Sequence, residues 1–477
     1  MKKKKLSLGV ALLPIFILVL LLSYNVLIYG DDALGGSNQF ILLLGGAFAG
    51  IVGFFYNVSY DTMLEKIAVN LKSVTGALLI LLFVGALAGT WLISGIIPAM
   101  IYYGLQILHP SIFLPACIII CSIISLATGS SWTTSATVGI ALIGIGKVLG
   151  VPEGMIAGAV ISGAYFGDKL SPLSDTTNLA PAMAGGELFS HIRYMTLTTI
   201  PSILITLIVF LILSLTQETT GETNTLALMA AIKDKFTING WLFLVPATVI
   251  LLIVKKSPPL IALLVGTLMG GIFALLFQSN ILLEITKSRV LTTEVAYRAI
   301  MDAISVSTEI TTSNALLNDL FTSGGMEGML GTIWLIICAM VFGGIMDAIG
   351  ALESISNALL NWAQTTFQLF ASTVVSCLAI NLTASDQYLS IVIPGKMFAK
   401  AYKDRKLAPE NLSRTLEDSG TVTSVLIPWN TCGAYQSGVL GVGVGEYFIY
   451  AVFNWISPFM TLLYAAFDIK IKALKEK

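Results

Sequence analysis

Charged residues and histidine are scarce in this sequence. Asp, Glu, Lys and Arg make up 11% of its 477 residues, whereas soluble globular proteins carry about 25%. So few charges cannot cover the surface of a soluble protein of this length. The chain has two histidines, His109 and His191, which are too few for the usual zinc sites. These shortages exclude a soluble fold and argue against a zinc enzyme.

Several functional motifs are also missing. The sequence contains no G-x-x-x-x-G-K-[ST] run, so ATP bound to this chain does not drive its activity. The glycines of 441–445 are no nucleotide fingerprint, because no strand precedes them. The net charge of −1 and the lack of a basic patch with interleaved aromatics predict no nucleic-acid partner. Without a nucleophile–base pair or a metal cluster, we predict that the protein is not an enzyme.

Long apolar runs recur along the whole chain, which is 56% hydrophobic. Each is close to the roughly 20 residues that a helix needs to cross a bilayer, and only helices and closed barrels satisfy their backbone polar groups in lipid. We therefore predict an all-α polytopic membrane protein with ten spans. They are 8–29, 38–57, 75–105, 154–186, 193–215, 240–254, 258–278, 327–350, 411–432 and 434–466. Two further apolar pairs, 111–146 and 368–401, are interrupted by polar residues and are predicted as re-entrant hairpins.

The basic residues indicate the orientation. With this arrangement, 18 of the 26 Lys and Arg fall on one side, which the positive-inside rule makes cytoplasmic. Lys2–Lys5 precede an apolar run without a small-residue cleavage site, so we predict an uncleaved first span. Both termini are then cytoplasmic in a multi-pass protein of the cell (inner) membrane. The long segment 279–325 is predicted as an outer loop that could hold an amphipathic helix.

The two halves of the sequence resemble each other at an offset near 255 residues. The matching segments are 128–131 with 383–386, 152–153 with 409–410, 162–163 with 419–420, 174–176 with 429–431, and Pro201 with Pro458. The loop 147–153 has one Lys, whereas its counterpart 400–410 is strongly basic, so equivalent loops lie on opposite sides. Two inverted repeats are predicted, 1–216 and 240–477, joined by a loop at 217–239. Such repeats are typical of secondary transporters, whose sites lie where the repeats meet.

Polar clusters interrupt the apolar helices at both predicted hairpin tips and in the spans 154–186 and 411–432. Hydroxyls and carbonyls freed at helix breaks can replace the hydration shell of a hard cation. The predicted cation- or substrate-binding residues are Thr128, Ser130, Ser131, Thr133, Ser174, Thr176, Thr177, Asn178, Thr383, Ser385, Asn430 and Thr431. The alternative is that these side chains only hydrogen-bond between helices or to their own backbone.

Five carboxylates lie within or beside the spans, and ionisable groups there are functional candidates. They are Asp175, Asp386, Asp168, Glu417 and Asp418. Asp175 is the strongest candidate because it sits in a helix break among hydroxyls. The alternative is pairing, of Asp168 with Lys169 and of Glu417 and Asp418 with Arg414. Lys169 could instead hold an organic anion, Asp347 could mark a span end, and His191 and Arg193 are predicted at a cytoplasmic edge.

At these clusters the sequence resembles the NhaC family of Na⁺/H⁺ antiporters, over nearly the whole chain. The similarity rests on segments 129–146, 160–185 and 411–435. The resemblance implies two inverted repeats, each with a re-entrant hairpin and a broken helix, forming a transport domain beside a scaffold that often dimerises. It therefore implies a homodimer in the lipid bilayer. The Na⁺ sites that it implies are Ser130, Ser131, Asp175, Thr176, Ser385, Asp386, Asn430 and Thr431.

We therefore predict a secondary active transporter that exchanges Na⁺ for H⁺ by alternating access and needs no cofactor. The alternative is a Na⁺- or H⁺-coupled carrier of a small organic acid, of the malate/lactate type, or of an amino acid. Carboxylates outnumber bases at the predicted site, and neither hairpin tip contains the arginine that a carboxylate substrate would favour. Both observations favour cation exchange.

Overall fold

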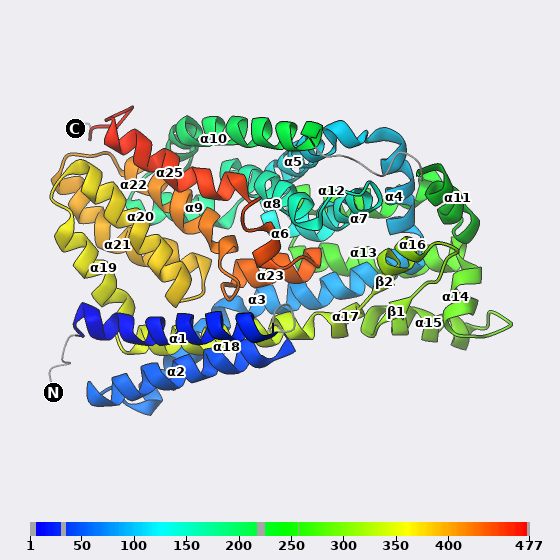
Figure 1. The fold of residues 1–477 in the computed structure, drawn as a ribbon, viewed down its shortest axis with the longest axis horizontal. Coiled ribbons are helices and arrows are strands. Elements are labelled where there is room, and N and C mark those ends of the chain that lie inside the picture. The colour runs from blue at the N-terminus through cyan, green and yellow to red at the C-terminus, as the bar shows by residue number, and fades with distance from the viewer. Residues whose placement is uncertain (1–5, 30–34, 217–224, 256, 475–477) are drawn as a thin grey trace.

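The structure is a computed structural model that describes residues 6–29, 35–216, 225–255 and 257–474. It is almost entirely helical (Figure 1). Within these described ranges, eight helices are long and apolar enough to cross a membrane, and a bent pair, Leu226–Lys235 with Gly240–Val254, could form a ninth span. The protein is thus a polytopic membrane protein, as its apolar runs predict.

The first half of the chain forms α1 to α10, with a short π-helix, η2. The bounds are α1 Leu8–Tyr29, α2 Ser37–Phe55, α3 Tyr60–Ile93, α4 Ile96–Ile107, α5 Pro110–Thr128, α6 Ser131–Thr134, η2 Ser135–Gly139, α7 Ile140–Val148, α8 Glu153–Leu170, α9 Asp175–Ala184 and α10 Leu188–Thr216.

The second half adds the remaining helices and one small sheet. The bounds up to the sheet are α11 Thr225–Lys235, η3 Gly240–Phe243, α12 Leu244–Val254, α13 Pro259–Phe277, α14 Ser279–Ile285, α15 Thr293–Ser305, β1 Thr308–Glu309, α16 Ala315–Leu320 and β2 Thr322–Ser323. Those after it are α17 Gly325–Gly328, α18 Leu330–Ala348, α19 Ala351–Trp362, α20 Thr366–Thr383, α21 Gln387–Asp404, α22 Pro409–Leu416, η4 Glu417–Thr421, η5 Ser424–Leu426, α23 Thr431–Leu440, α24 Val444–Tyr447 and α25 Val452–Ala466.

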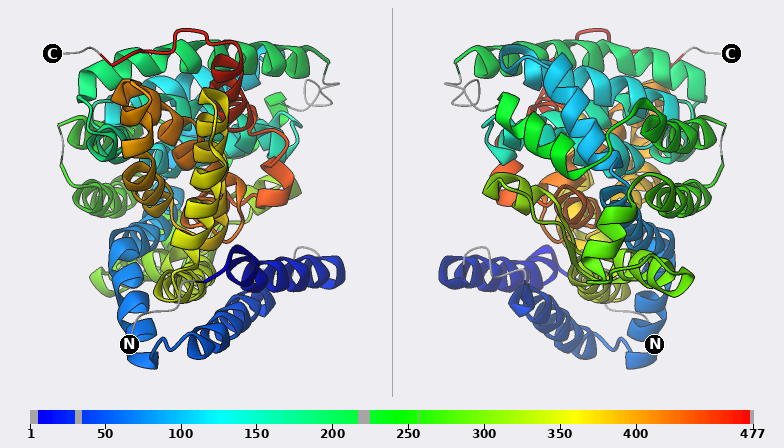
Figure 2. Two further views of the ribbon diagram at one scale, coloured as in Figure 1. Left: turned by 90° about the vertical axis from the view of Figure 1, so that its left-hand side faces the viewer. Right: turned by 90° about the vertical axis from the view of Figure 1, so that its right-hand side faces the viewer.

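The helices form two layers (Figures 1 and 2). One layer holds α1, α2, α18 and α3, with α13 packed on α3. The other holds α5, α8, α10 and α25 together with α20 to α22. Glycines allow close packing within the first layer, since a Cβ added to Gly46 of α2 would lie 3.6 Å from the Cα of Phe342 in α18. The layers meet around α6, α9 and α23, near the middle of the molecule.

Segment 279–325, predicted as an outer loop, contains helices α14 and α15 and the hairpin of β1 and β2, in which Thr308 pairs with Ser323. Helix α15 has the amphipathic character expected, with Ala299 and Ala303 buried on one side. The segment rests on α3 through two glycines. A Cβ on Gly89 would lie 1.8 Å from the carbonyl oxygen of Ala303, and one on Gly85 would lie 2.1 Å from that of Gly325. Only glycine therefore fits at these two positions.

The order of helices in the first half recurs in the second. A left-handed glycine, Gly95 or Gly350, precedes a helix of 12 residues in each half. The next helix in each half, α5 or α20, is followed by a left-handed residue at a polar break: Gly129 directly after α5, and Ser385 two residues after α20. The later breaks and the helix ends at Gly185 and Gly441, both left-handed, follow at a nearly constant spacing of about 256 residues.

The structure corrects the register of the predicted repeat by one residue. The capping residues pair Ser130 with Asp386 and Ser174 with Asn430, whereas the sequence comparison paired Asp175 with Asn430. Backbone geometry decides which residue caps each helix. Because similar polar residues stand on both sides of the cap, the sequence alone does not reveal a shift of one residue.

Several span boundaries also differ from those predicted. The helix expected from residue 75 begins at Tyr60 and ends before a turn at Gly95, so α3 has 34 residues and α4 is separate. The second broken helix continues to Leu440, and the last span begins at Val452 instead of residue 434. Apolar composition alone does not show the backbone turns at Gly95 and Gly441.

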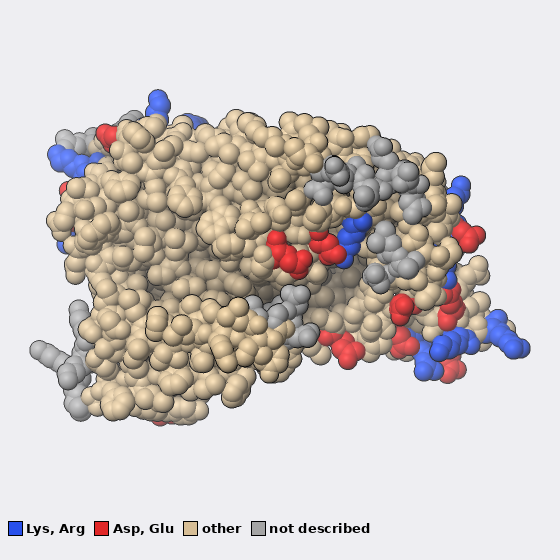
Figure 3. All heavy atoms as spheres, viewed as in Figure 1, with Lys and Arg blue, Asp and Glu red and all other residues tan. Residues whose placement is uncertain are grey.

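The visible face of the molecule is largely free of charge (Figure 3). Basic and acidic side chains gather toward the two ends of the long axis, with one further group near its middle. The start of α1 and the end of α25 lie toward the same end (Figure 1). Lys2–Lys5, Lys256, Lys475 and Lys477, which carry part of the orientation argument, lie outside the described residues.

Candidate functional site

Four helices break at the polar clusters, and a new helix begins after each break with a capping side chain. The caps are Ser130 for α6, Ser174 for α9, Asp386 for α21 and Asn430 for α23. Each side-chain oxygen accepts a hydrogen bond from a backbone N–H of the first helical turn, which is the usual role of these residue types. The sequence clusters thus correspond to real breaks in the helices.

Left-handed backbone brings each hairpin tip against a broken helix. At the first tip Gly129 has a φ of 71°, and a Cβ there would lie 2.6 Å from that of Leu173, in the break between α8 and α9. At the second tip Ser385 has a φ of 59°, and its carbonyl oxygen accepts a hydrogen bond of 3.0 Å from the N–H of Thr431. Each hairpin tip is therefore paired with the broken helix of its own half.

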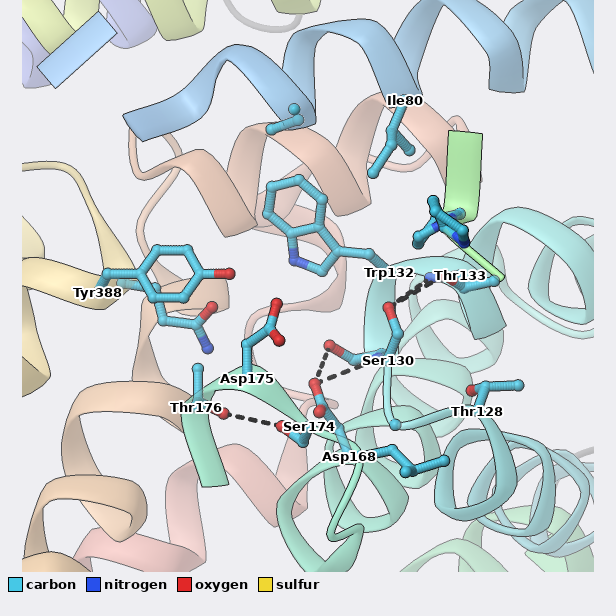
Figure 4. A pocket seen from close by; sticks show the side chains of 18 of the residues that line it. Ile80, Thr128, Ser130, Trp132, Thr133, Asp168, Ser174, Asp175, Thr176 and Tyr388 are labelled. Carbon is cyan, nitrogen blue, oxygen red and sulfur yellow. Dashed lines mark hydrogen bonds between the residues drawn. The ribbon is translucent and has the colours of Figure 1, made fainter. Parts of the chain in front are cut away.

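A cavity of about 680 Å³ lies where the breaks meet α3 and the turn between α12 and α13 (Figure 4). Three carboxylates line it, those of Asp168, Asp175 and Asp386, and no Lys or Arg does so among the described residues. Seven of the predicted hydroxyl residues also line it. They are Thr128, Ser130, Ser131, Thr133, Ser174, Thr176 and Thr431.

Asp168 is held in place by the first hairpin tip. Its Oδ2 accepts hydrogen bonds from the backbone N–H (3.1 Å) and the hydroxyl (2.7 Å) of Ser131, at the start of α6. The expected alternative, pairing with Lys169, does not occur. A buried carboxylate fixed by the N-terminus of a helix has favourable electrostatics.

Asp175 is the first residue of α9, and its side chain is exposed to the cavity. Figure 4 shows it between Tyr388 and the break that holds Asp168. Asp386 is buried and caps α21 by accepting a 2.9 Å hydrogen bond from the N–H of Leu389. The three carboxylates thus come from three elements far apart in sequence.

Five predicted binding residues do not line the cavity but support the breaks around it. Thr177 donates to the carbonyl oxygens of residues 168 and 169, and Asn178 to those of residues 172 and 174. Thr383 donates to a carbonyl of its own helix. Ser385 is buried at its left-handed turn, and its hydroxyl has no hydrogen-bond partner among the described residues. Asn430 donates to the carbonyl oxygen (3.1 Å) and the side-chain oxygen (3.2 Å) of Asn381.

Glu417 and Asp418 lie apart from the cavity, in the π-helix η4. Asp418 forms a fully buried ion pair with Lys169 and accepts a 2.8 Å hydrogen bond from the hydroxyl of Thr198. The expected pairing with Arg414 is wrong, because that guanidinium lies 4.6 Å from the centre of the Tyr194 ring instead. Lys169 is therefore committed to Asp418 and does not line the cavity as an anion ligand.

Two other expectations concern residues at the ends of helices. Asp347 forms a 2.8 Å ion pair with Lys66, and both side chains are partly exposed, which fits the end of a span. His191, predicted at an aqueous edge beside Arg193, is completely buried and its Nδ1 lies 2.8 Å from the hydroxyl of Ser413. Sequence could not reveal this, because the covering helix, α22, comes from the other half.

The sequence analysis missed four residues that shape the site. Ser73 of α3 and Ser257 line the cavity, but both lie near span ends beside lysines, outside the four polar clusters. Tyr388 follows the second hairpin tip directly, so a wider window around that tip would have included it. Asn381, in the last turn of α20, joins the second hairpin to the π-helix by donating to the carbonyl oxygen of Gly420 (2.7 Å).

The first hairpin also contacts the second broken helix. The rings of Trp132 in α6 and Tyr435 in α23 stack with centres 4.0 Å apart, and the tyrosine hydroxyl donates to the carbonyl oxygen of Trp132 (3.1 Å). A cavity with carboxylates, hydroxyls and helix breaks between two similar halves suits a small cation, because hard cations prefer oxygen ligands.

Apolar helices long enough to cross a membrane, with helix breaks around an acid-lined cavity, define a polytopic membrane protein. The sequence pattern of the Na⁺/H⁺ antiporter family matches residues 163–469. The chain belongs to this family.

Relatives with assigned functions cover almost the whole chain. The Na⁺/H⁺ antiporter NhaC of Alkalihalophilus pseudofirmus is 36% identical over 90% of this chain and 89% of its own length. The NhaC protein of Bacillus subtilis is 34% identical over 97% of this chain and 98% of its own length. A malate-2H⁺/Na⁺-lactate antiporter of Bacillus subtilis is 36% identical over 88% of this chain and 86% of its own length. Both transport types weighed from the sequence thus occur among its relatives.

Proposed function

We propose that the protein is a secondary active transporter that exchanges Na⁺ for H⁺ across a cell membrane by alternating access. The observation that carries this proposal is the cavity lined by Asp168, Asp175 and Asp386 without a basic residue among those described. Such a cavity attracts cations, and each carboxylate can hold either Na⁺ or a proton. Because the two ions compete for the same oxygens, release of one favours uptake of the other.

The ligands proposed for Na⁺ are those implied by the family resemblance. They are Ser130, Ser131, Asp175, Thr176, Ser385, Asp386, Asn430 and Thr431. Six of them line the cavity, which supports the assignment. Ser385 and Asn430 do not line the cavity but support its wall. Ser385 fixes the second hairpin tip, and Asn430 caps the start of α23. Asp168 is the remaining exchanging carboxylate. No cofactor takes part beyond the transported ions.

The transport unit consists of two inverted repeats, each with a re-entrant hairpin and a broken helix. The recurrence of breaks and left-handed residues at a spacing of about 256 residues supports the repeat. In Figure 1 the first hairpin, α5 to α7, and the second, α20 and α21, approach the centre from opposite ends. Both termini are cytoplasmic, and a homodimer would form through the scaffold.

Reconstitution tests this proposal directly. The purified protein is placed in liposomes with an internal pH dye, a pH gradient is imposed, and Na⁺ is added outside with no organic solute present. We expect prompt proton movement that requires Na⁺. The matched control is Asp347→Asn, which removes a carboxylate outside the cavity and should leave the signal intact. No response to Na⁺ would contradict the proposal.

A coupled carrier of a small organic acid is the second candidate. A cavity of about 680 Å³ has room for more than a bare ion, and four helix N-termini at the breaks would favour an anionic group. In the same liposomes, a proton signal that appears only after malate, lactate or an amino acid is added would move the assignment to this candidate.

A further inference from the structure

A line of polar side chains runs between α10 and the α22–η4 segment, outside the cavity. We name it the α10–α22 seam and define it by its members. These are Ser190, His191, Tyr194 and Thr198 of α10, and Glu410, Asn411, Ser413, Arg414, Glu417 and Asp418 of α22 and η4. Hydrogen bonds join the two sides along its length, from Ser190 with Glu410 at one end (2.5 Å) to Thr198 with Asp418 at the other (2.8 Å).

The spacing of these residues places them along one face of each helix. Glu410, Arg414 and Glu417 recur at i, i+4 and i+7, which share a helix face. The last two are completely buried, and Glu410 is 7% exposed. Ionisable side chains buried in a membrane protein are energetically costly and usually functional. The proposed cation cavity uses none of the three.

Glu417 is the unusual member of the seam. Both of its carboxyl oxygens are buried and have no hydrogen-bond partner among the described residues. Arg414, one turn earlier, has turned toward the rings of Tyr194 and Tyr464, and Lys169 pairs with Asp418. An ionised carboxylate buried without a partner would be very costly, whereas the neutral acid avoids that cost. A neutral Glu417 therefore fits this environment better than an ionised one.

The π-helix around Glu417 supports a functional role. Single π-helical turns are rare and occur often at functional sites. Here the turn Glu417–Thr421 leaves the carbonyl oxygens of Gly420 and Thr421 to side-chain donors, Asn381 and Gln387 of the second hairpin. The segment that holds Glu417 is thus tied to the hairpin that supplies Asp386 to the cavity.

The seam has one end at the surface and the other beside the cavity. At the surface end, Glu410 accepts a 2.5 Å hydrogen bond from Lys472, whose side chain is 37% exposed. At the inner end, Lys169 of the buried ion pair follows Asp168, which lines the cavity. Between them, His191 has a buried Nε2 without a partner among the described residues. Titratable groups thus extend from the surface to the cavity wall.

Charged groups lie on several elements around Glu417. Arg414, one turn earlier, has guanidinium nitrogens that are buried without a hydrogen-bond partner among the described residues. Asp168 and Lys169 of α8 and Asp418 on its own turn act on Glu417 electrostatically. The further elements packed against η4 are α9, α20, α21 and α25, and their titratable side chains include Asp175, which faces the cavity, and Cys377, Tyr402 and Tyr464. Asp168 is thus a cavity carboxylate whose charge acts on Glu417.

We propose that the α10–α22 seam conducts the exchanged proton, with Glu417 as its carrier, while the cation passes through the cavity. As Na⁺ leaves, the O–H bond of Glu417 breaks and an O–H bond forms on a cavity carboxylate. Glu417 then takes a proton from the surface through His191 and Glu410. Only protons are transferred along the seam, so no further reactant is needed. This proposal rests on Na⁺/H⁺ exchange being the function.

Two transport modes of the same liposomes test it. Na⁺/H⁺ exchange is followed with the internal pH dye, and Na⁺/Na⁺ exchange is followed with ²²Na⁺ at equal pH on both sides. For Glu417→Gln we expect Na⁺/H⁺ exchange to fall by about a hundredfold, the usual contribution of one positioned proton carrier. Na⁺/Na⁺ exchange should stay within about twofold of wild type, because it requires no proton.

Further variants separate this role from a structural one. Glu417→Asp keeps a carboxyl group and should restore most of the Na⁺/H⁺ exchange. Ser457→Ala, a buried change in α25 whose hydroxyl donates to its own helix, should leave both modes unchanged. If Glu417→Gln does not insert, His191→Gln should still slow Na⁺/H⁺ exchange and spare Na⁺/Na⁺ exchange. Unchanged Na⁺/H⁺ exchange in Glu417→Gln, or an equal loss of both modes, would overturn the proposal. A wild-type protein without Na⁺/H⁺ exchange would instead refute the function itself.

Discussion

The two broken helices have similar backbones but distribute their charges differently. In the first, α8–α9, both carboxylates near the break, Asp168 and Asp175, line the cavity. In the second, α22–α23, the break carries the neutral residues Asn430 and Thr431, and the acidic residues lie in the π-helix away from the cavity. The comparison teaches that similar backbones do not imply similar chemistry. The first broken helix supplies carboxylates to the cavity, and the second supplies a neutral part of its wall.

The largest expected effect comes from making the first break as neutral as the second. In Asp175→Asn, Na⁺-dependent proton movement should fall to the level of empty liposomes, because the cavity loses its most exposed carboxylate while the amide keeps the shape. Insertion and the elution profile in detergent should not change. Asp347→Asn, at an exposed ion pair, serves as the control. Normal exchange by Asp175→Asn would remove this residue from the mechanism.

The buried ion pair that joins the two broken helices is the next test. Removing one partner leaves an uncompensated charge and should cost about 3–5 kcal/mol of stability. Lys169→Met and Asp418→Asn should therefore each lower the unfolding temperature clearly in detergent, measured by intrinsic fluorescence.

The double variant, Lys169→Met with Asp418→Asn, should recover part of that loss because no unpaired charge remains. Strictly additive losses in the double variant would show that the pair does not couple α8 to η4.

A smaller effect is expected at the neutral break. Asn430 caps α23 and bonds to Asn381 of the second hairpin. Replacing a capping residue with alanine costs about 1 kcal/mol, so Asn430→Ala should raise the Na⁺ concentration for half-maximal exchange by roughly fivefold. The rate of proton movement as a function of external Na⁺ measures this. An unchanged half-maximal concentration would show that the second break does not shape the cation site.

Much of the fold follows from the sequence because lipid imposes a simple rule on composition. Runs of apolar residues such as 8–29 and 258–278 predicted α1 and α13 almost to the residue. The polar clusters predicted the four helix breaks, because serine, aspartate and asparagine cap helices wherever the chain turns. The backbone turn at Gly95 and the one-residue shift of the repeat could not be predicted, since both depend on local φ angles.

The site was predictable only as far as local sequence defines it. Asp175 and Thr176 could be assigned because they stand at a break in their own helix. The environment of Asp418 could not, because its partners Lys169 and Thr198 come from the other half of the chain. Arg414 is close to Asp418 in the sequence and was therefore the expected partner. In the folded protein, however, the Arg414 guanidinium packs over the ring of Tyr194.

The glycines of α3 have a consequence for movement. At Gly85 and Gly89 segment 279–325 packs directly on the backbone of α3, so a rotation of α3 about its axis by even one residue would drive a side chain into a carbonyl oxygen. At Gly76, which lines the cavity, nothing lies within 4 Å of where a Cβ would be. Close packing at Gly85 and Gly89 therefore fixes helix α3 against segment 279–325, whereas its surface at Gly76 is open beside the cavity.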